Sequence, residues 1–226
     1  MLDAALRVFA ERGYHGTAVP EIAAAAKVGT GSLYRHFATK EVLVNEVYRD
    51  AKSRLGKALL DGLDLGSPGD AWFPEAWSRL SRFARAEPDA FRFLEMQDHV
   101  PYLDEASRQM ELSVLTPLFL AGQRIRDERA ANSPSREADA RPSPLPVDVA
   151  IALIWGAFVG LIKAERLGYL RLTDEAITAA GEALWGVVMP GRSPSPNAQA
   201  QNAHAHVLSP TPPSNERSSS NSKRRK

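Results

Sequence analysis

Side chains that can donate hydrogen bonds gather in a short stretch near the start of the chain. Between Thr30 and Lys40 the donors are Thr30, Ser32, Tyr34, Arg35, His36 and Lys40, and Gly31 leaves the backbone uncovered among them. Such donors suit phosphate oxygens and the edges of nucleic-acid bases. Taken singly, Tyr34 and His36 are as well explained by packing, and Lys40 by solvation. Together they predict a surface that contacts nucleic acid.

A second group of reactive side chains consists of Glu95, Asp98 and His99. On a helix, Glu95 and His99 are four residues apart and share a face, a spacing that can hold a metal ion. No second histidine lies nearby, and the chain has no cysteine. It also lacks a nucleophile motif and a phosphate-binding glycine loop. We therefore expect no catalytic residue, no metal and no cofactor, and predict that the protein is not an enzyme.

Aromatic and methionine side chains are frequent between residues 72 and 119. Such a stripe is more often plain core than a binding site. An apolar cavity with a few polar anchors is, however, also the usual form of a small-molecule site. The candidate pocket residues are Phe93, Met96, His99, Tyr102 and Trp155. Their composition favours a lipophilic or aromatic ligand.

The elements that must position these side chains are predicted to be helices throughout. Apolar residues recur at helical spacing, and almost no stretch alternates as a strand would. Thr17 and Thr39 are suitable N-caps and Gly13 is a stop signal. Helices are expected at residues 2–12, 17–26, 30–37, 40–60, 70–86, 88–98, 104–128, 146–167 and 173–189. Pro117 should kink or interrupt the seventh of these helices.

Charge divides the chain into three parts although the net charge is only +1. Residues 1–60 carry nine basic and six acidic side chains, residues 61–190 carry thirteen and twenty, and residues 191–226 carry six and one. A basic head on an acidic body suits the binding of a polyanion. We predict a DNA-binding head at residues 1–48, a body for effector binding and dimerisation at residues 49–190, and a disordered low-complexity tail at residues 191–226.

The composition, with 44% hydrophobic and 24% charged residues, is ordinary for a globular protein. No uninterrupted apolar run reaches the roughly 18 residues of a membrane span. The first residues also lack the pattern of a signal peptide. The expected location is the cytoplasm, with no membrane partner.

The segment from Ile22 to Phe37 has the spacing of a helix-turn-helix. Its first helix carries four consecutive alanines, which allow close packing, and its turn is Lys27-Val28-Gly29. Val28 and Leu33 are expected to point inward. In this motif the second helix enters the major groove of double-stranded DNA.

Residues 2–48 resemble the N-terminal domain of the TetR family of transcriptional regulators. The most specific part is G-S-L-Y-R-H-F-x-x-K-E-x-L, at residues 31–43. The resemblance implies an all-helical homodimer, usually a repressor that leaves a palindromic operator when a small molecule enters the body. One departure is Lys27, where the family usually has glycine. If Lys27 is left-handed, it costs up to about 1 kcal/mol relative to glycine.

The resemblance also implies roles for single residues. Thr17 caps the second helix and meets phosphate, and Lys40 contacts phosphate. Tyr34 and His36 contact the DNA backbone or bases. Thr30, Gly31 and Ser32 lie at the groove.

Two apolar helices close the body, at residues 146–167 and 173–189. Gly156 and Gly160 permit close helix approach, so these helices either form a four-helix dimer interface or complete the monomer core. The resemblance favours the dimer. The leading hypothesis is a ligand-responsive dimeric repressor. The alternative is a ligand-independent regulator or architectural protein whose body only dimerises, which a filled aromatic cluster would favour.

Overall fold

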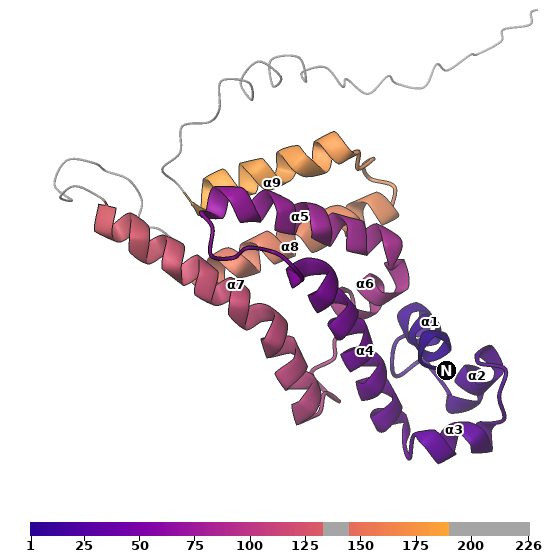
Figure 1. Ribbon diagram of the computed structural model, residues 1–226. Coiled ribbons are helices and arrows are strands. Elements are labelled where there is room, and N and C mark those ends of the chain that lie inside the picture. The colour runs from indigo at the N-terminus through magenta and orange to yellow at the C-terminus, as the bar shows by residue number, and fades with distance from the viewer. Residues whose placement is uncertain (133–144, 190–226) are drawn as a thin grey trace, which may run out of the picture. The chain divides into compact units, whose positions relative to one another are not determined.

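The computed structural model describes residues 1–132 and 145–189, and every regular element in these ranges is a helix (Figure 1). The helices are Leu2–Arg12 (α1), Val19–Ala25 (α2), Thr30–His36 (α3), Lys40–Leu60 (α4), Gly69–Ala86 (α5), Pro88–Glu95 (α6), Glu105–Asn132 (α7), Val147–Arg166 (α8) and Asp174–Val188 (α9). The predicted all-α fold, with a helix-turn-helix head and a helical body, is confirmed. The predicted tail lies outside the described residues.

The start of α2 differs from the prediction. Ala18, not Thr17, is the N-cap residue, and its N–H donates to Glu21 Oε2 at 3.0 Å. The hydroxyl of Thr17 donates instead to the carbonyl of Gly13 at 2.7 Å. Gly13 ends α1 with φ 70°, a left-handed conformation that glycine adopts without strain. Thr17 therefore secures the end of α1 rather than the beginning of α2.

Lys27 occupies a strained position in the turn between α2 and α3. Its φ of 56° makes it the only non-glycine residue with positive φ in the described part of the chain. Lys27 is therefore left-handed, the case in which the sequence predicts a cost. A left-handed lysine costs about 1 kcal/mol relative to glycine. The turn is held nonetheless, because the N–H of Val28 donates to the Ala23 carbonyl at 3.0 Å.

Helix α4 belongs to both the head and the body. It begins as predicted at Thr39, whose hydroxyl accepts the N–H of Val42 at 3.2 Å. Leu43 and Val47 are buried near its first turns, and Leu55 and Leu59 near its end. It packs against α1 in the head and against α5, α6 and α7 in the body. One continuous helix thus carries packing contacts of both parts.

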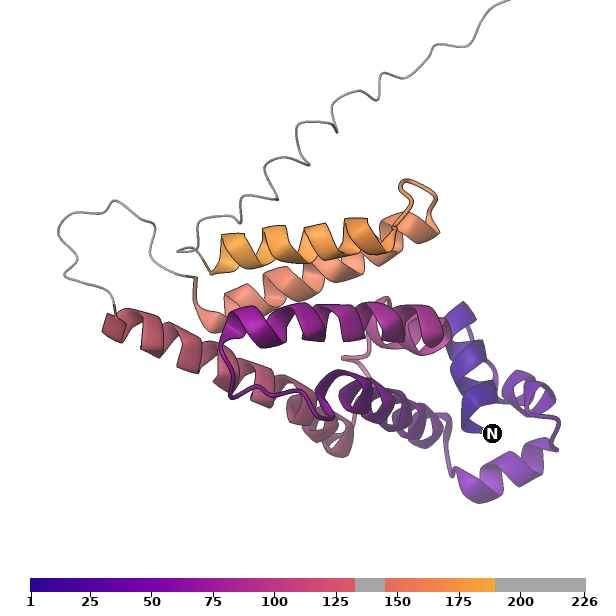
Figure 2. The ribbon, with the colours of Figure 1, turned by 45° about the horizontal axis from the view of Figure 1, so that its top comes forward.

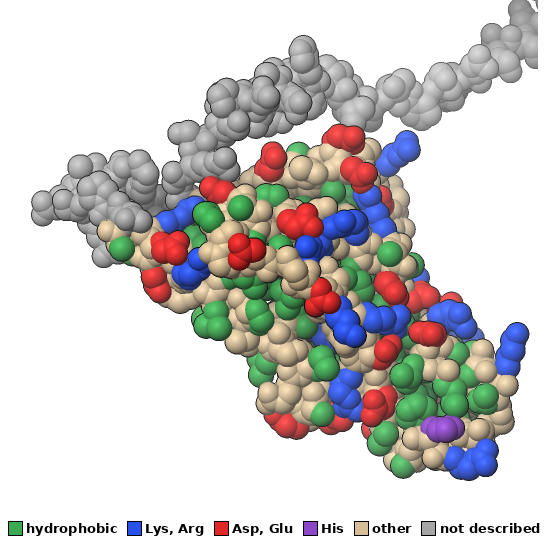
Figure 3. All heavy atoms as spheres, viewed as in Figure 1, with side chains coloured by type: hydrophobic (Ala, Val, Ile, Leu, Met, Phe, Trp, Pro, Cys, Tyr) green, Lys and Arg blue, Asp and Glu red, His purple; other side chains and the backbone are tan. Residues whose placement is uncertain are grey.

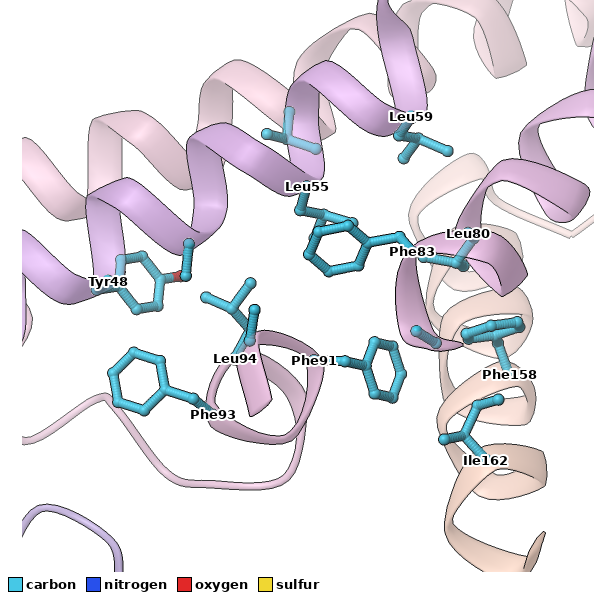
Figure 4. Packing of buried hydrophobic residues seen from close by; sticks show 14 of the residues in the cluster. Tyr48, Leu55, Leu59, Leu80, Phe83, Phe91, Phe93, Leu94, Phe158 and Ile162 are labelled. Carbon is cyan, nitrogen blue, oxygen red and sulfur yellow. The ribbon is translucent and has the colours of Figure 1, made fainter. Parts of the chain in front are cut away.

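The body core forms where α4, α5, α6 and α8 meet (Figure 4). Phe91 of α6 points towards Phe158 of α8, with ring centroids 5.7 Å apart in an edge-to-face arrangement. Phe93 points the other way, towards Tyr48 of α4, at 6.5 Å. Helix α6 therefore inserts aromatic rings on two sides and ties α8 to α4.

Two body helices have other limits than predicted. Helix α6 ends at Glu95, three residues early, because residues 98–102 form a turn in which the Asp98 carboxylate accepts the N–H of Val100 at 3.0 Å. Helix α7 runs through Pro117 without interruption and reaches Asn132. Pro117 was predicted to kink or interrupt this helix, and the interruption does not occur. A proline removes one intrahelical hydrogen bond, which the packing of α7 against α4, α5 and α8 offsets.

Helices α8 and α9 lie side by side in both views (Figures 1 and 2). By length and composition α8 is apolar enough to cross a membrane, although no uninterrupted apolar run has that length. Only 22% of its apolar window is buried. Val149 and Leu153 of α8 and Val187 of α9 are exposed. This pair of helices therefore presents an apolar surface that the described chain does not cover.

Candidate functional site

The donors between Thr30 and Lys40 are anchored by one buried side chain. Leu33 is 1% exposed and packs into the core of the head, while its neighbour Tyr34 is 49% exposed. Arg35 and His36 are also exposed, and Thr30 and Ser32 are half-buried. Because successive residues lie about 100° apart around a helix axis, burying Leu33 turns its neighbours Tyr34 and Arg35 outward. In Figure 3, Lys, Arg and His side chains lie among hydrophobic ones on the head, at the lower right of the view.

Gly31 is not required by the fold. Its φ is not positive, and a Cβ built on it would have no heavy atom within 4 Å. The residue is exposed on the outer face of α3. No turn and no close packing contact requires a glycine at this position. Its small size therefore leaves room for a surface that approaches α3.

Lys40 is positioned by an aromatic ring that the sequence analysis did not single out. Its Nζ lies 4.2 Å from the centroid of the Tyr14 ring, a cation–π contact. The Tyr14 hydroxyl donates to the Glu41 carboxylate, and Tyr14 also stacks on Tyr102 at 4.4 Å. Burial and the neighbouring Glu41 carboxylate raise the pKa of Tyr14 to about 12. Tyr14 therefore stays neutral and holds Lys40 beside α3.

Thr17 does not share this surface. It is 3% exposed, and its hydroxyl hydrogen is used by the Gly13 carbonyl. Its neighbour Val19 is buried as well. The other predicted head residues lie on α3 and at the start of α4 and are exposed or half-buried, whereas Thr17 is buried.

Three of the five predicted pocket residues lie where head and body meet. His99 is 7% exposed, with Nδ1 2.6 Å from the Tyr102 hydroxyl and Nε2 2.5 Å from the Phe93 carbonyl. A neutral imidazole satisfies both contacts, donating from Nε2 and accepting at Nδ1. The Phe93 ring packs against Phe9 of α1 at 6.1 Å. These residues form a junction rather than the wall of a pocket.

A separate apolar hollow lies between α4, α5, α7, α8 and α9. Its volume is about 670 Å³, including its opening to solvent. All four tryptophans of the chain line it: Trp72, Trp77, Trp155 and Trp185. No charged side chain is among its lining residues. Of the predicted pocket residues, only Trp155 lies here, and Met96 contacts Arg166 instead, with Sδ 3.2 Å from Nη1.

The sequence could not reveal this hollow, because its walls come from five helices. Two glycines lie against tryptophans of its wall. A Cβ at Gly181 would lie 2.7 Å from the Trp77 ring, and one at Gly69 would lie 2.6 Å from Trp185. Trp77 in turn donates to the Ile177 carbonyl at 2.6 Å. These glycines let the indole rings approach the backbones of α9 and α5 closely.

Comparison with protein families gives two matches along the chain. Residues 1–47 match the family model of bacterial regulatory proteins of the tetR family, and residues 64–189 match the tetracyclin repressor-like C-terminal domain. The chain belongs to the TetR family. Its members are DNA-binding transcriptional regulators rather than enzymes, in agreement with the prediction that this protein is not an enzyme.

Curated relatives of this TetR-family protein include two repressors. KstR2 of Rhodococcus jostii is 31% identical over 125 residues, which are 51% of this chain and 61% of that protein. The repressor Rv3405c of Mycobacterium tuberculosis is 37% identical over 106 residues, 46% of this chain and 54% of that protein. The matched part thus spans about half to three-fifths of these relatives.

Solved structures of the family share the fold. A regulator from Marinobacter aquaeolei superposes with a TM-score of 0.68 at 22% identity, covering 81% of this chain and 91% of that one. FadR of Bacillus subtilis, solved in complex with stearoyl-CoA, gives 0.58 at 18% identity, covering 85% and 97%. Each superposition covers more than four-fifths of this chain.

The His99 junction predicts a loss of stability in mild acid. Burial lowers the pKa of His99 below its ordinary 6.5. At a pH between the lowered pKa of the folded protein and the ordinary pKa of the unfolded chain, His99 binds a proton only in the unfolded chain. The free energy of unfolding should therefore fall as the pH is lowered from about 7 to about 5.5. Urea denaturation across this range measures it. His99→Gln should flatten the dependence and His36→Gln should not; equal profiles for His99→Gln and the parent would contradict the assignment.

Proposed function

We propose that this protein is a cytoplasmic homodimeric repressor that binds a palindromic operator through α3 and releases it when an uncharged lipophilic or aromatic molecule enters the hollow. The observation that carries the DNA-binding part is the surface of α3, where Leu33 is buried and the donors Tyr34, Arg35 and His36 are exposed. In this proposal Thr30, Gly31 and Ser32 lie at the groove, and Tyr34, Arg35, His36 and Lys40 supply donors to phosphates and base edges. Thr17, being buried and internally bonded, is left out.

Replacing Tyr34 or Lys40 by alanine should weaken DNA binding about tenfold each. Lys40→Ala should also reduce the slope of log affinity against log salt by about one, because one phosphate contact is lost. Fluorescence anisotropy with a duplex from the promoter region beside the protein's own gene measures both. Lys57→Ala is the matched control, since Lys57 is an exposed lysine at the other end of α4. If both variants bind as tightly as the parent, α3 does not read DNA.

The proposed dimer uses α8 and α9. Val149 and Leu153 are 40% and 47% exposed on α8, and Val187 is 67% exposed on α9. A Cβ at Gly156 or Gly160 would meet nothing within 4 Å, so their small size leaves that face of α8 free for close approach. Covering such a face with the same face of a second copy accounts for its apolar character without a membrane.

Leu153→Glu should convert the dimer to a monomer, because it places two charges in the middle of the symmetric apolar interface. Analytical ultracentrifugation measures the change in mass. Leu120→Glu, at a leucine that is 60% exposed on α7, is the control and should remain dimeric. A Leu153→Glu protein that sediments like the parent would place the dimer interface elsewhere.

The effector part of the proposal is supported by the chemistry of the hollow. Its lining is aromatic and aliphatic, and without charged side chains it offers no compensation for a ligand charge. The hollow also argues against the alternative of a fully packed body that serves only dimerisation. FadR of Bacillus subtilis, which has the same fold, was solved in complex with stearoyl-CoA, a ligand whose acyl chain is apolar although its coenzyme A part is charged.

N-phenyl-naphthylamine, an uncharged aromatic dye that fluoresces in apolar surroundings, should bind the hollow and quench tryptophan emission. Ala150→Leu fills part of the hollow and should weaken dye binding about tenfold, because the added methylenes occupy ligand space. Ala58→Leu, on the exposed side of α4, is the control. Equal dye affinity in the two variants would show that the dye binds elsewhere, and no binding to the parent would favour the ligand-independent alternative.

A further inference from the structure

The segment from Arg92 to Gln97, at the end of α6, makes polar contacts in two directions. On one side it bonds to the wall of the hollow, and on the other it bonds to the first helix of the head. The two contacts are made by side chains only two residues apart, Glu95 and Gln97. They join parts of the chain that are distant in sequence.

The contact with the hollow is a buried charged hydrogen bond. Trp155, whose ring lines the hollow, donates its indole N–H to Glu95 Oε2 at 2.5 Å. The Glu95 side chain is 9% exposed, and its other oxygen has no hydrogen-bond partner but faces Lys52 Nζ of α4 at 3.6 Å. A buried carboxylate depends strongly on each of its few partners. Movement of Trp155 therefore obliges Glu95 to move or to lose its one hydrogen bond.

The contact with the head closes the end of α1. Gln97 Nε2 donates to the carbonyls of Phe9 and Ala10, at 2.7 and 3.2 Å, and Arg92 Nη1 lies 3.5 Å from the Ala10 carbonyl. The last carbonyls of a helix have few partners within the helix itself. Phe9 is also the residue whose carbonyl accepts the N–H of Gly13, where α1 ends. Side chains of the body thus hold the final turn of a helix of the head.

We propose that the segment Arg92–Gln97 couples the hollow directly to α1, so that a molecule displacing Trp155 loosens the Gln97 hydrogen bonds and shifts the head. Trp155, Glu95 and Gln97 act as positioning residues in this route. It runs beside the covalent connection through α4. The inference rests on the proposed function for its biological meaning, but the mechanical coupling exists in the free protein and can be measured there.

The test compares two matched tryptophans. Trp155→Phe and Trp185→Phe each remove one indole N–H from the hollow, and each N–H donates to a carboxylate, Glu95 in one case and Asp70 at 2.6 Å in the other. Hydrogen–deuterium exchange of the full-length protein, followed by mass spectrometry, reports on peptides covering residues 9–16. Trp155→Phe should speed exchange at the end of α1 roughly fivefold or more, and Trp185→Phe should leave it as in the parent.

A double-mutant cycle then tests whether Trp155 and Gln97 affect the end of α1 through one shared route or independently. Gln97→Ala should speed the same exchange, and adding Trp155→Phe to it should have little further effect, since the link is already broken. Additive effects, or equal exchange in the two tryptophan variants, would overturn the proposal. The outcome does not depend on DNA or on an effector. A parent that fails to bind DNA would remove the proposed function and leave the coupling measurable.

Discussion

Burial of α4 along most of its length is the constraint on which the rest of the structure depends. Leu43 and Val44 are fully buried in the head and Leu55 is fully buried in the body. A helix is stiff because each turn is hydrogen-bonded to the next. With its two ends packed into different cores, α4 cannot rotate in one without disturbing the other. The head is therefore held by the body, although the helix-turn-helix alone would be enough to contact DNA.

A buried polar network around Asn45 lies between head and body, and it makes the geometry of their contact specific. Asn45 of α4 is 3% exposed; its amide donates to the Tyr102 carbonyl at 2.8 Å and its oxygen accepts from the Asp104 N–H and the Ser107 hydroxyl. His99 adds a second network beside it. Apolar packing tolerates small sliding movements, but a buried hydrogen-bond network fits one arrangement best. A change of state at this contact therefore requires an exchange of partners.

Features that depend on residues close together in the sequence were predicted, and features that depend on packing between helices were missed. The limits of α1 and α4, the Thr39 cap and the burial of Leu33 in α3 depend on residues within a few positions of one another, and the sequence predicted them. Thr17 was assigned to the wrong helix end because its choice between capping α2 and bonding to Gly13 depends on how α1 and α2 pack. Pro117 was expected to kink or interrupt α7, but the helix continues through it.

The sequence by itself determined the family, the all-helical fold and the side chains that α3 presents, because a short motif with a strict spacing encodes all three. The sequence also predicted Trp155 as a pocket residue, but not which residues surround it. Only the tertiary structure decided that the four tryptophans share one hollow while His99 and Tyr102 hold the head to the body. The physical reason is that a cavity and a junction are formed by helices far apart in the chain, and no local pattern records which faces meet.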